Sequence, residues 1–271
     1  MMRTTSLGPP IAHGATAEIY AWGDGKILKL FKEHTSRSTV EYEAHITNAV
    51  HAAGLPIPAM HSIVEIGERY GLVYDRVKGL LMVDLLKTKP WTLLRLAEQL
   101  ADLQVEIHKH TVPDLPSLRE RLLRKIETKG RLTASLKKTA LAALDKLPDG
   151  DQLCHGDFHP LNVMVTAGGP VIIDWNDATC GHPSGDVART ALLLSSGEVP
   201  PGTPFGRLFK LFQGRFYRRY TKRYSQLQPS IWQTVPPWLP VVAAARLSDN
   251  IPDPQGKMMA IIRQGFGTEG V

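Results

Sequence analysis

The first third of the chain alternates short apolar runs with turns that contain glycine. Residues 11–31 predict three strands, separated by a small-residue turn at 14–17 and by a Gly-Asp-Gly turn. Residues 38–53 carry apolar side chains at helical spacing, and Gly54 ends that pattern. Residues 61–79 predict two more strands. An antiparallel sheet with one helix is therefore expected in this part of the chain.

Beyond residue 80 the hydrophobic pattern becomes helical. Helices are expected within residues 91–110, 117–147, 205–224, 238–248 and 255–266. His108 and His110, at the end of the first of these, are predicted to be surface residues, and the many charges of the second are predicted to be solvated. The change of pattern predicts a sheet-containing lobe at residues 1–76 and a mainly helical lobe at residues 77–271.

One stretch among the helices has strand character and carries the candidate chemistry. Residues 155–177 read HGDFHPLNVMVTAGGPVIIDWND, in which two apolar runs flank a Gly-Gly-Pro turn and predict a hairpin. The hairpin would hold Asn162 at the start of one strand and Asp174 at the end of the other. Magnesium prefers oxygen ligands and usually binds one or two protein groups together with substrate phosphates. Asn162 and Asp174 are therefore predicted metal ligands, while Asp157 is predicted to orient a hydroxyl and accept its proton.

This spacing of Asp157, Asn162 and Asp174 is that of the kinase catalytic loop and metal-binding aspartate. The stretch resembles the aminoglycoside phosphotransferase and choline kinase-like family, small-molecule kinases in which Gly156 replaces the arginine of protein kinases. The resemblance implies an α+β, protein-kinase-like bilobal fold, with an antiparallel sheet and one helix in the N-terminal lobe and a mainly helical C-terminal lobe. It also implies ATP and Mg²⁺ as cofactors and transfer of the γ-phosphoryl group to a hydroxyl of a small molecule.

The N-terminal pattern offers matching nucleotide contacts. The turn at 14–17 is similar to family loops of the form G-A-T-x-E-x-Y, so that Gly14 and Thr16 would lie over the ATP phosphates. Lys29 interrupts an apolar strand, where a lysine is costly unless it is paired. The resemblance makes Lys29 the nucleotide lysine. Asp75 and Val77 would lie in the hinge that contacts adenine through backbone groups.

Two acidic residues compete as the partner of Lys29, and other roles stay open. The resemblance favours Glu43 over Glu41 on the helix at residues 38–53. Ser184 or Asp186 could cap the helix that follows the hairpin, and in the family this aspartate also braces the catalytic loop. His159 could reach the substrate or support the loop.

Composition limits the class of protein. With 43% hydrophobic and 21% charged residues among 271, the chain can bury a sizeable core. No apolar run approaches the roughly 18 residues of a membrane span, and the N-terminus has no signal-peptide pattern. The two cysteines suggest no disulfide framework, and Cys154 is expected in the core. A cytoplasmic protein without membrane contact is expected, of unspecified oligomeric state.

The charge is unevenly distributed. The net charge is +6, but residues 199–248 hold eight Lys or Arg and no Asp or Glu. Within this segment, apolar side chains recur every four residues at Leu208, Phe212, Phe216, Tyr220 and Tyr224. That stripe is predicted to be core and the basic residues a solvated face, so a nucleic-acid partner is not expected.

The same charge bears on the acceptor. Polycationic acceptors need an acidic pocket, and acidic groups could come from Asp157, Asp177, Asp186, Asp249 or Asp253. A neutral or anionic hydroxyl compound fits the basic segment at least as well. Two other functions stay open: a nucleotide-binding module without turnover, and a basic-surface kinase that acts on or docks to a macromolecule. A protein kinase proper would carry an Ala-Pro-Glu motif after Asp174, which the sequence lacks.

Overall fold

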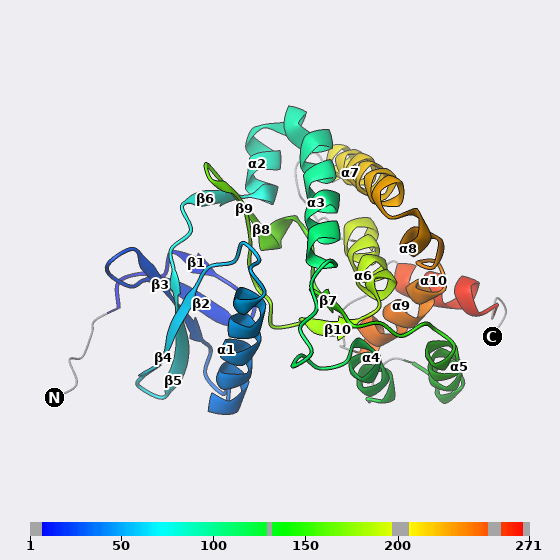
Figure 1. Ribbon diagram of the computed structural model, residues 1–271, viewed down its shortest axis with the longest axis horizontal. Coiled ribbons are helices and arrows are strands. Elements are labelled where there is room, and N and C mark those ends of the chain that lie inside the picture. The colour runs from blue at the N-terminus through cyan, green and yellow to red at the C-terminus, as the bar shows by residue number, and fades with distance from the viewer. Residues whose placement is uncertain (1–6, 129–131, 197–205, 249–255, 268–271) are drawn as a thin grey trace. The chain divides into compact units, whose positions relative to one another are not determined.

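The computed structural model describes residues 7–128, 132–196, 206–248 and 256–267 (Figure 1). The chain forms two compact units, Met1–Leu81 with Val163–Asn176 and Met82–Asn162 with Asp177–Val271. The first unit thus extends past the predicted boundary at residue 76 and takes in the hairpin. The division of the chain into lobes by function stays a prediction.

The first unit contains a five-stranded antiparallel sheet in the order β1-β2-β3-β5-β4. Its strands are β1 (Ala12–His13), β2 (Ala17–Ala21), β3 (Lys26–Phe31), β4 (Met60–Ile66) and β5 (Arg69–Asp75). The β2–β3 turn is tight because Gly23, Asp24 and Gly25 all have positive φ. The five strands predicted from residues 11–31 and 61–79 are confirmed.

Helix α1 (Arg37–Ala52) packs on one face of this sheet. It begins where the Ser36 side chain accepts a hydrogen bond from the backbone N–H of Thr39, and it ends before Gly54, whose φ is 86°. Val40 and Ala44 are buried against the sheet on that face. Apolar side chains of β3 and β5 form a second cluster, Leu28, Leu30 and Val73. The predicted helix is confirmed.

A three-stranded sheet completes the first unit, in the order β6-β8-β9. Its strands are β6 (Gly79–Leu81), β8 (Val163–Thr166) and β9 (Gly169–Ile172). Val163 pairs with Ile172 at the open end of the β8–β9 hairpin, and the Thr166 hydroxyl donates to the Gly169 carbonyl across its turn. The predicted hairpin is confirmed, with Asn162 just before its first strand and Asp174 two residues after its second.

The second unit is mainly helical, as predicted. Its helices are α2 (Met82–Thr88), α3 (Leu93–Ile107), α4 (Leu118–Glu127), α5 (Ala134–Asp145), α6 (Pro183–Ser196), α7 (Gly206–Leu227), α8 (Pro229–Gln233), α9 (Trp238–Ser248) and α10 (Lys257–Phe266). Two short 3₁₀ helices, η1 (Pro90–Thr92) and η2 (Pro160–Asn162), and the strand pair β7 (Gln152–Cys154) and β10 (Thr179–Gly181) complete it. Cys154 is fully buried, as expected.

Helix α7 packs along α3 (Figure 1). Phe216, Tyr220 and Tyr224 are buried and Phe212 is half-buried, so the predicted apolar stripe is core at its last three positions; the side chain of Leu208 lies outside the described ones. Part of the basic face is paired rather than simply solvated, because Arg219 bonds Glu98 and Arg223 bonds Asp102 on α3. No helix among the described residues is both long and apolar enough to span a membrane.

Candidate active site

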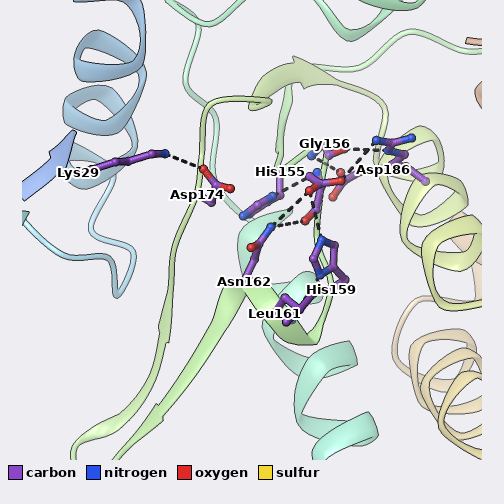
Figure 2. A network of polar contacts seen from close by, with 10 residues as sticks. Lys29, His155, Gly156, His159, Leu161, Asn162, Asp174 and Asp186 are labelled. Atoms are coloured by element: carbon purple, nitrogen blue, oxygen red, sulfur yellow. Dashed lines mark hydrogen bonds and ion pairs between the residues drawn. The ribbon is translucent and has the colours of Figure 1, made fainter. Parts of the chain in front are cut away.

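Lys29 on β3 is the centre of a charged cluster in the first unit. Its Nζ donates to Glu43 Oε1 at 2.7 Å and to Asp174 Oδ1 at 3.0 Å (Figure 2 shows the second contact). Burial alone would lower the pKa of Lys29, but the charges of Asp174 and Glu43 outweigh it and raise that pKa above its ordinary value. Lys29 therefore stays charged on an otherwise apolar strand because it is paired with two carboxylates. Such a partner was expected, since an unpaired lysine is costly in an apolar strand.

The contacts of α1 decide between the two candidate partners of Lys29. Glu43 is buried and also accepts a hydrogen bond from the hydroxyl of Tyr74, at 3.3 Å. Glu41 instead pairs with Arg37 on the exposed side of the helix, at 2.8 Å. Glu43 is thus the partner, as the resemblance favoured.

Asp174 lies in a strained turn just after β9. Its φ is 64°, a left-handed conformation that costs a non-glycine residue about 1–3 kcal/mol and is concentrated at functional sites. The next residue, Trp175, is buried, and its indole N–H donates to the carbonyl of Ile172 at 3.3 Å. This anchor holds the turn, so that the Asp174 side chain stays partly exposed, at 41%.

The other predicted nucleotide contacts are also in the first unit. The turn between β1 and β2 is closed by a hydrogen bond from Gly14 N–H to the Ala17 carbonyl, at 2.8 Å, and Thr16 is exposed in it. In the hinge, the N–H of Asp75 donates to Ala59 and its carboxylate contacts His61 at 2.6 Å. Among the described residues the backbone N–H of Val77 has no partner. The N–H of Val77 could therefore donate a hydrogen bond to a ligand. The N–H of Asp75 is already used, so the backbone of Asp75 could contact a ligand only through its carbonyl.

The catalytic-loop candidates lie in the second unit: Asp157 follows β7, and Asn162 is the last residue of η2. The Asn162 side-chain amide donates to the Asp157 carbonyl at 2.9 Å and lies 3.5 Å from its carboxylate. Two other side chains contact that carboxylate: His159 Nε2 is 3.2 Å from Oδ2, and Arg189 Nη2 on α6 is 3.4 Å from Oδ1. Figure 2 shows Asn162 and His159 directed at the same short loop.

These contacts determine the charge of Asp157. Burial would raise the pKa of Asp157, but the hydrogen bond with His159 and the charges of His159 and Arg189 hold that pKa well below its usual range. Asp157 is therefore ionised at any physiological pH. A carboxylate of this kind is a good orienting acceptor for a hydroxyl and a weak base.

Gly156 has a steric reason to be glycine. Its φ is 80°, and a Cβ at this position would lie 2.3 Å from the carbonyl oxygen of Asp177. A side chain therefore cannot be placed here without moving the loop that carries Asp157. Protein kinases have an arginine at this position of the motif, whereas the close approach of residue 177 requires a glycine here.

A buried network braces the loop from behind. Asp186, 1% exposed, accepts from the Gly156 N–H at 2.7 Å and from Gln104 at 2.8 Å, and lies 3.0 Å from His108 Nε2. Tyr224 reaches the other ring nitrogen of His108, at 2.9 Å. Burial would raise the pKa of Asp186, but these hydrogen bonds, that of His108 first, keep it below its ordinary value. Asp186 thus braces the loop, as the resemblance implied.

Three expectations are corrected by the contacts of the second unit. His108 was predicted to be a surface residue, but it is buried, because the end of α3 packs against α6 and α7. Neither Ser184 nor Asp186 caps α6: both lie inside its first turn, and the Ser184 hydroxyl bonds Ile231 and Thr234.

The predicted solvation of the charges within residues 117–147 is also wrong for Arg119, which donates to Asp149 and to two backbone carbonyls.

The predicted metal ligands have the right chemistry for a hard cation. Asn162 uses its amide nitrogen on Asp157 and so keeps its side-chain oxygen for a ligand, and Asp174 uses one carboxylate oxygen on Lys29 and keeps the other. No cluster of three or more His, Cys, Asp or Glu in the described part of the chain could hold a metal by itself. Magnesium usually needs no such cluster, because substrate phosphates and water complete its shell. Each of the two side chains therefore offers an oxygen of the kind that Mg²⁺ binds.

Comparison with known proteins agrees with these features. Residues 8–236 match the phosphotransferase enzyme family. The chain belongs to this family. No curated protein sequence matches it.

Solved structures that resemble this phosphotransferase share its fold at low sequence identity. A thermostable mutant of aminoglycoside phosphotransferase APH(4)-Ia is 17% identical, with 99% of this chain and 98% of that chain covered and a TM-score of 0.66. An aminoglycoside-3'-phosphotransferase of type VIII is 18% identical over 89% and 90%, with a TM-score of 0.58. Amicoumacin kinase hAmiN, solved with AMP-PNP and Ca²⁺, is 14% identical over 95% and 87%, with a TM-score of 0.56. The α+β, protein-kinase-like fold is thereby confirmed.

The sequence of this phosphotransferase did not reveal every residue at the site. Arg189, His108 and Gln104 were missed as neighbours of the catalytic loop. A polar residue within the apolar face of a predicted helix was the available signal for Gln104, which is fully buried in α3. His159 was left undecided, and its contact with Asp157 makes it at least a positioning residue.

Proposed function

We propose that the chain is a Mg²⁺-dependent kinase that transfers the γ-phosphoryl group of ATP to a hydroxyl group of a small molecule. The single observation that carries this proposal is the set of contacts among the predicted site residues: Asn162 is hydrogen-bonded to Asp157, and Lys29 is bonded to both Glu43 and Asp174. These five residues are of the types that a kinase uses to contact the phosphates, to hold the metal and to orient the hydroxyl. Membership of the phosphotransferase enzyme family supports the same reaction class.

The first unit would bind the nucleotide. Lys29, held by Glu43, would contact the α- and β-phosphates, and the backbone N–H groups of the turn that holds Gly14 and Thr16 would lie over the phosphates. The hinge would contact adenine through the Asp75 carbonyl and the Val77 N–H. Some structures that the chain resembles were solved with ADP or AMP-PNP, which supports ATP as the donor here.

Asn162 and Asp174 would hold Mg²⁺ through their side-chain oxygens. When bound, Mg²⁺ would supply positive charge that neutralises the negative charge of the phosphates. Asp174 has a second task, since its other oxygen pairs with Lys29 and fixes the lysine near the phosphates. The left-handed backbone at Asp174 is the strain expected of a residue placed for a ligand.

Asp157 would orient the acceptor. The hydroxyl oxygen bonds to the γ-phosphorus as the bond between that phosphorus and the ADP oxygen breaks, and the hydroxyl proton passes to Asp157. Phosphoryl transfer has a loose transition state, in which the attacking oxygen needs little activation. A carboxylate whose pKa is held low therefore suits the task, because it fixes the direction of the hydroxyl and takes the proton late.

The test is ADP release from Mg-ATP with a panel of hydroxyl acceptors, with Asp157→Ala as the blank. The panel contains aminoglycosides, choline-like amino alcohols, sugars, nucleosides and hydroxy acids. We expect release that depends on one acceptor class, on Mg²⁺ and on Asp157. Equal release by wild type and Asp157→Ala would refute the proposal, and tight Mg-ATP binding without any transfer would favour a nucleotide-binding module.

A further inference from the structure

A groove lies on the second unit where helix α7 packs against η1 and the first turn of α3. Figure 1 shows α3 and α7 side by side. The groove has a volume of about 420 Å³, within the range of roughly 300–1,000 Å³ that is typical of ligand-binding clefts. Its described lining shares no residue with the candidate active site, so the proposed phosphoryl transfer does not account for it.

The wall that η1 and α3 contribute is apolar and open to solvent. Trp91 is 76% exposed and Leu94 is 52% exposed. The core face of α3 is formed by other side chains, such as Leu93 and Leu96, so Trp91 and Leu94 are not needed for that packing. Large apolar side chains that remain exposed beside a groove are typical of interaction surfaces, and tryptophan is often a residue that dominates binding. Together with Phe212 of α7, the apolar lining residues are Pro90, Trp91, Leu93 and Leu94.

The wall that α7 contributes is basic. Among these cations Arg219 forms an ion pair with Glu98. The other three are exposed, and no side-chain hydrogen bond or ion pair joins them to any residue that the structure describes. The described lining contains no Asp or Glu, so three positive charges are left uncompensated at the groove. The basic lining residues are Arg215, Arg218, Arg219 and Lys222.

The acidic residues of the adjacent helix α3 do not supply the missing negative charge. Glu98 and Asp102 are already paired with Arg219 and Arg223. Glu106, the third acidic residue of α3, is paired with a lysine just beyond the end of the helix. The compensating charge therefore has to come from a bound partner or from solvent ions.

The three uncompensated cations form a row along α7. Arg215, Arg218 and Lys222 are three and four residues apart, which places them as neighbours on one helix face. The row is about 10 Å long, because each residue of a helix rises by about 1.5 Å. Like charges at this spacing repel one another and destabilise the helix slightly. A partner with several negative charges in a line would remove that repulsion, whereas a single small anion would not.

The apolar wall distinguishes between the classes of polyanion. Single-stranded nucleic acid binds through aromatic side chains on which successive bases stack, and Trp91 is the one exposed aromatic residue of the described lining. An anionic membrane is flat, whereas this surface is concave. An acidic protein segment with apolar side chains along one edge matches both walls, since its carboxylates meet the row and its apolar groups meet Trp91 and Leu94.

We propose that this groove docks an acidic, amphipathic segment of a protein partner. Carboxylates three or four residues apart on a helix have the same spacing as the row of cations on α7. The proposal concerns a surface outside the candidate active site and does not depend on the proposed function.

The first test identifies the ligand. Random peptides of about 12 residues, long enough for three helical turns, are displayed on phage and selected on the wild-type protein. The double variant Arg215→Glu/Lys222→Glu serves for counter-selection. We expect enriched peptides in which Asp or Glu recurs every three or four residues beside Leu, Phe or Trp. Failure to enrich any peptide family, or enrichment of peptides without acidic residues, overturns the proposal.

The second test measures the enriched peptide by fluorescence anisotropy on two matched pairs of variants. Lys222→Glu changes the groove, and Lys138→Glu makes the same change at an exposed position of α5. Leu94→Ala and Leu123→Ala each shorten an exposed leucine, the second on α4. We expect Kd to rise at least about tenfold for Lys222→Glu and at least about threefold for Leu94→Ala, with both controls at the wild-type value. Thermal melting confirms that each variant is folded, and equal effects in groove and control variants overturn the proposal.

A final titration separates the classes of partner. A single-stranded thymidine oligonucleotide and phosphatidylserine vesicles replace the peptide in the same buffer. Binding of either that is tighter than peptide binding and is lost in Lys222→Glu overturns the choice of a protein partner. Because none of these experiments needs phosphoryl transfer, they decide the role of the groove whether or not the proposed function holds.

Discussion

The two polar clusters of this protein are held in place in different ways. The Lys29 cluster of the first unit is held by its own members, since Glu43 and Asp174 bind Lys29 directly and Asp174 is 41% exposed. The catalytic loop of the second unit is held from behind, by Asp186 and its buried partners. Residues that would meet the nucleotide thus also stabilise one another, whereas the backbone beside Asp157 is held by the buried Asp186 and its partners.

This difference separates two kinds of mutational effect. In the Lys29 cluster, loss of one residue should change ligand binding and the local electrostatics together. In the catalytic loop, loss of Asp157 should affect chemistry alone, and loss of its brace should affect stability first. The predictions below test this separation.

The largest expected effect is that of Asp157→Asn. The change keeps the shape of the side chain but removes the charge that accepts the hydroxyl proton, so kcat should fall by about 10²–10⁴-fold. The melting temperature should stay close to that of wild type. Steady-state kinetics with the best acceptor measures the first quantity, and near-normal kcat would show that Asp157 has no role in transfer.

A somewhat smaller loss is expected for Asp174→Asn, about 10²–10³-fold in kcat/KM, because the carboxylate charge that would hold Mg²⁺ and Lys29 is removed. The loss should diminish at high Mg²⁺ concentration, since weaker metal binding is restored by mass action. A titration of activity with Mg²⁺ measures this. An unchanged Mg²⁺ requirement would exclude Asp174 as a metal ligand.

His108→Leu should lower the free energy of unfolding by about 1–3 kcal/mol, because the buried carboxylate of Asp186 loses a hydrogen-bond partner. His110→Leu is the matched control just beyond the same helix end, where Nδ1 of the half-buried ring lies 3.0 Å from the backbone carbonyl of Glu106. Denaturant unfolding of the two variants gives the comparison. Equal stability of both variants would mean that the brace contributes nothing.

The smallest effect is a pH shift in His159→Gln. Without the hydrogen bond and charge of His159, the pKa of Asp157 should rise from its low position. The ionised form is the active one and is lost as pH falls through that pKa, so the acid limb of the kcat/KM profile should move to higher pH. An unmoved acid limb would show that His159 does not control the charge of Asp157.

The sequence predicted what is local and missed what is distant. Asp157, Asn162 and Asp174 lie within twenty residues, at a spacing that is typical of one catalytic site. Lys29 could be predicted because it is a charged residue within an apolar strand. His108 and Asp186 are 78 residues apart, and only the packing of α3 against α6 brings them together. His108 lies four residues after Gln104 and eight after Leu100 on the buried face of α3, but a histidine at a helix end is a typical surface residue, so its residue type favoured the wrong prediction.

The surroundings of the charged side chains were harder to predict from the sequence pattern than any other property. Residues 117–147 are rich in Lys and Arg and have the pattern of two solvated helices, yet Arg121 and Lys125 line a cavity beside the catalytic loop. Of the acidic residues considered for an acceptor pocket, Asp177 and Asp186 prove to be paired, and Asp249 and Asp253 lie outside the described residues.

The affinity for Mg-ATP of Asp157→Asn and Asp174→Asn, measured side by side by calorimetry, tests the division of labour most directly. Asp157→Asn should bind Mg-ATP as wild type does while its turnover is lost, and Asp174→Asn should bind about 10- to 100-fold more weakly. Equal loss of affinity in both variants, or a loss confined to Asp157→Asn, would contradict the assignment of nucleotide binding to the Lys29 cluster and of acceptor chemistry to the catalytic loop.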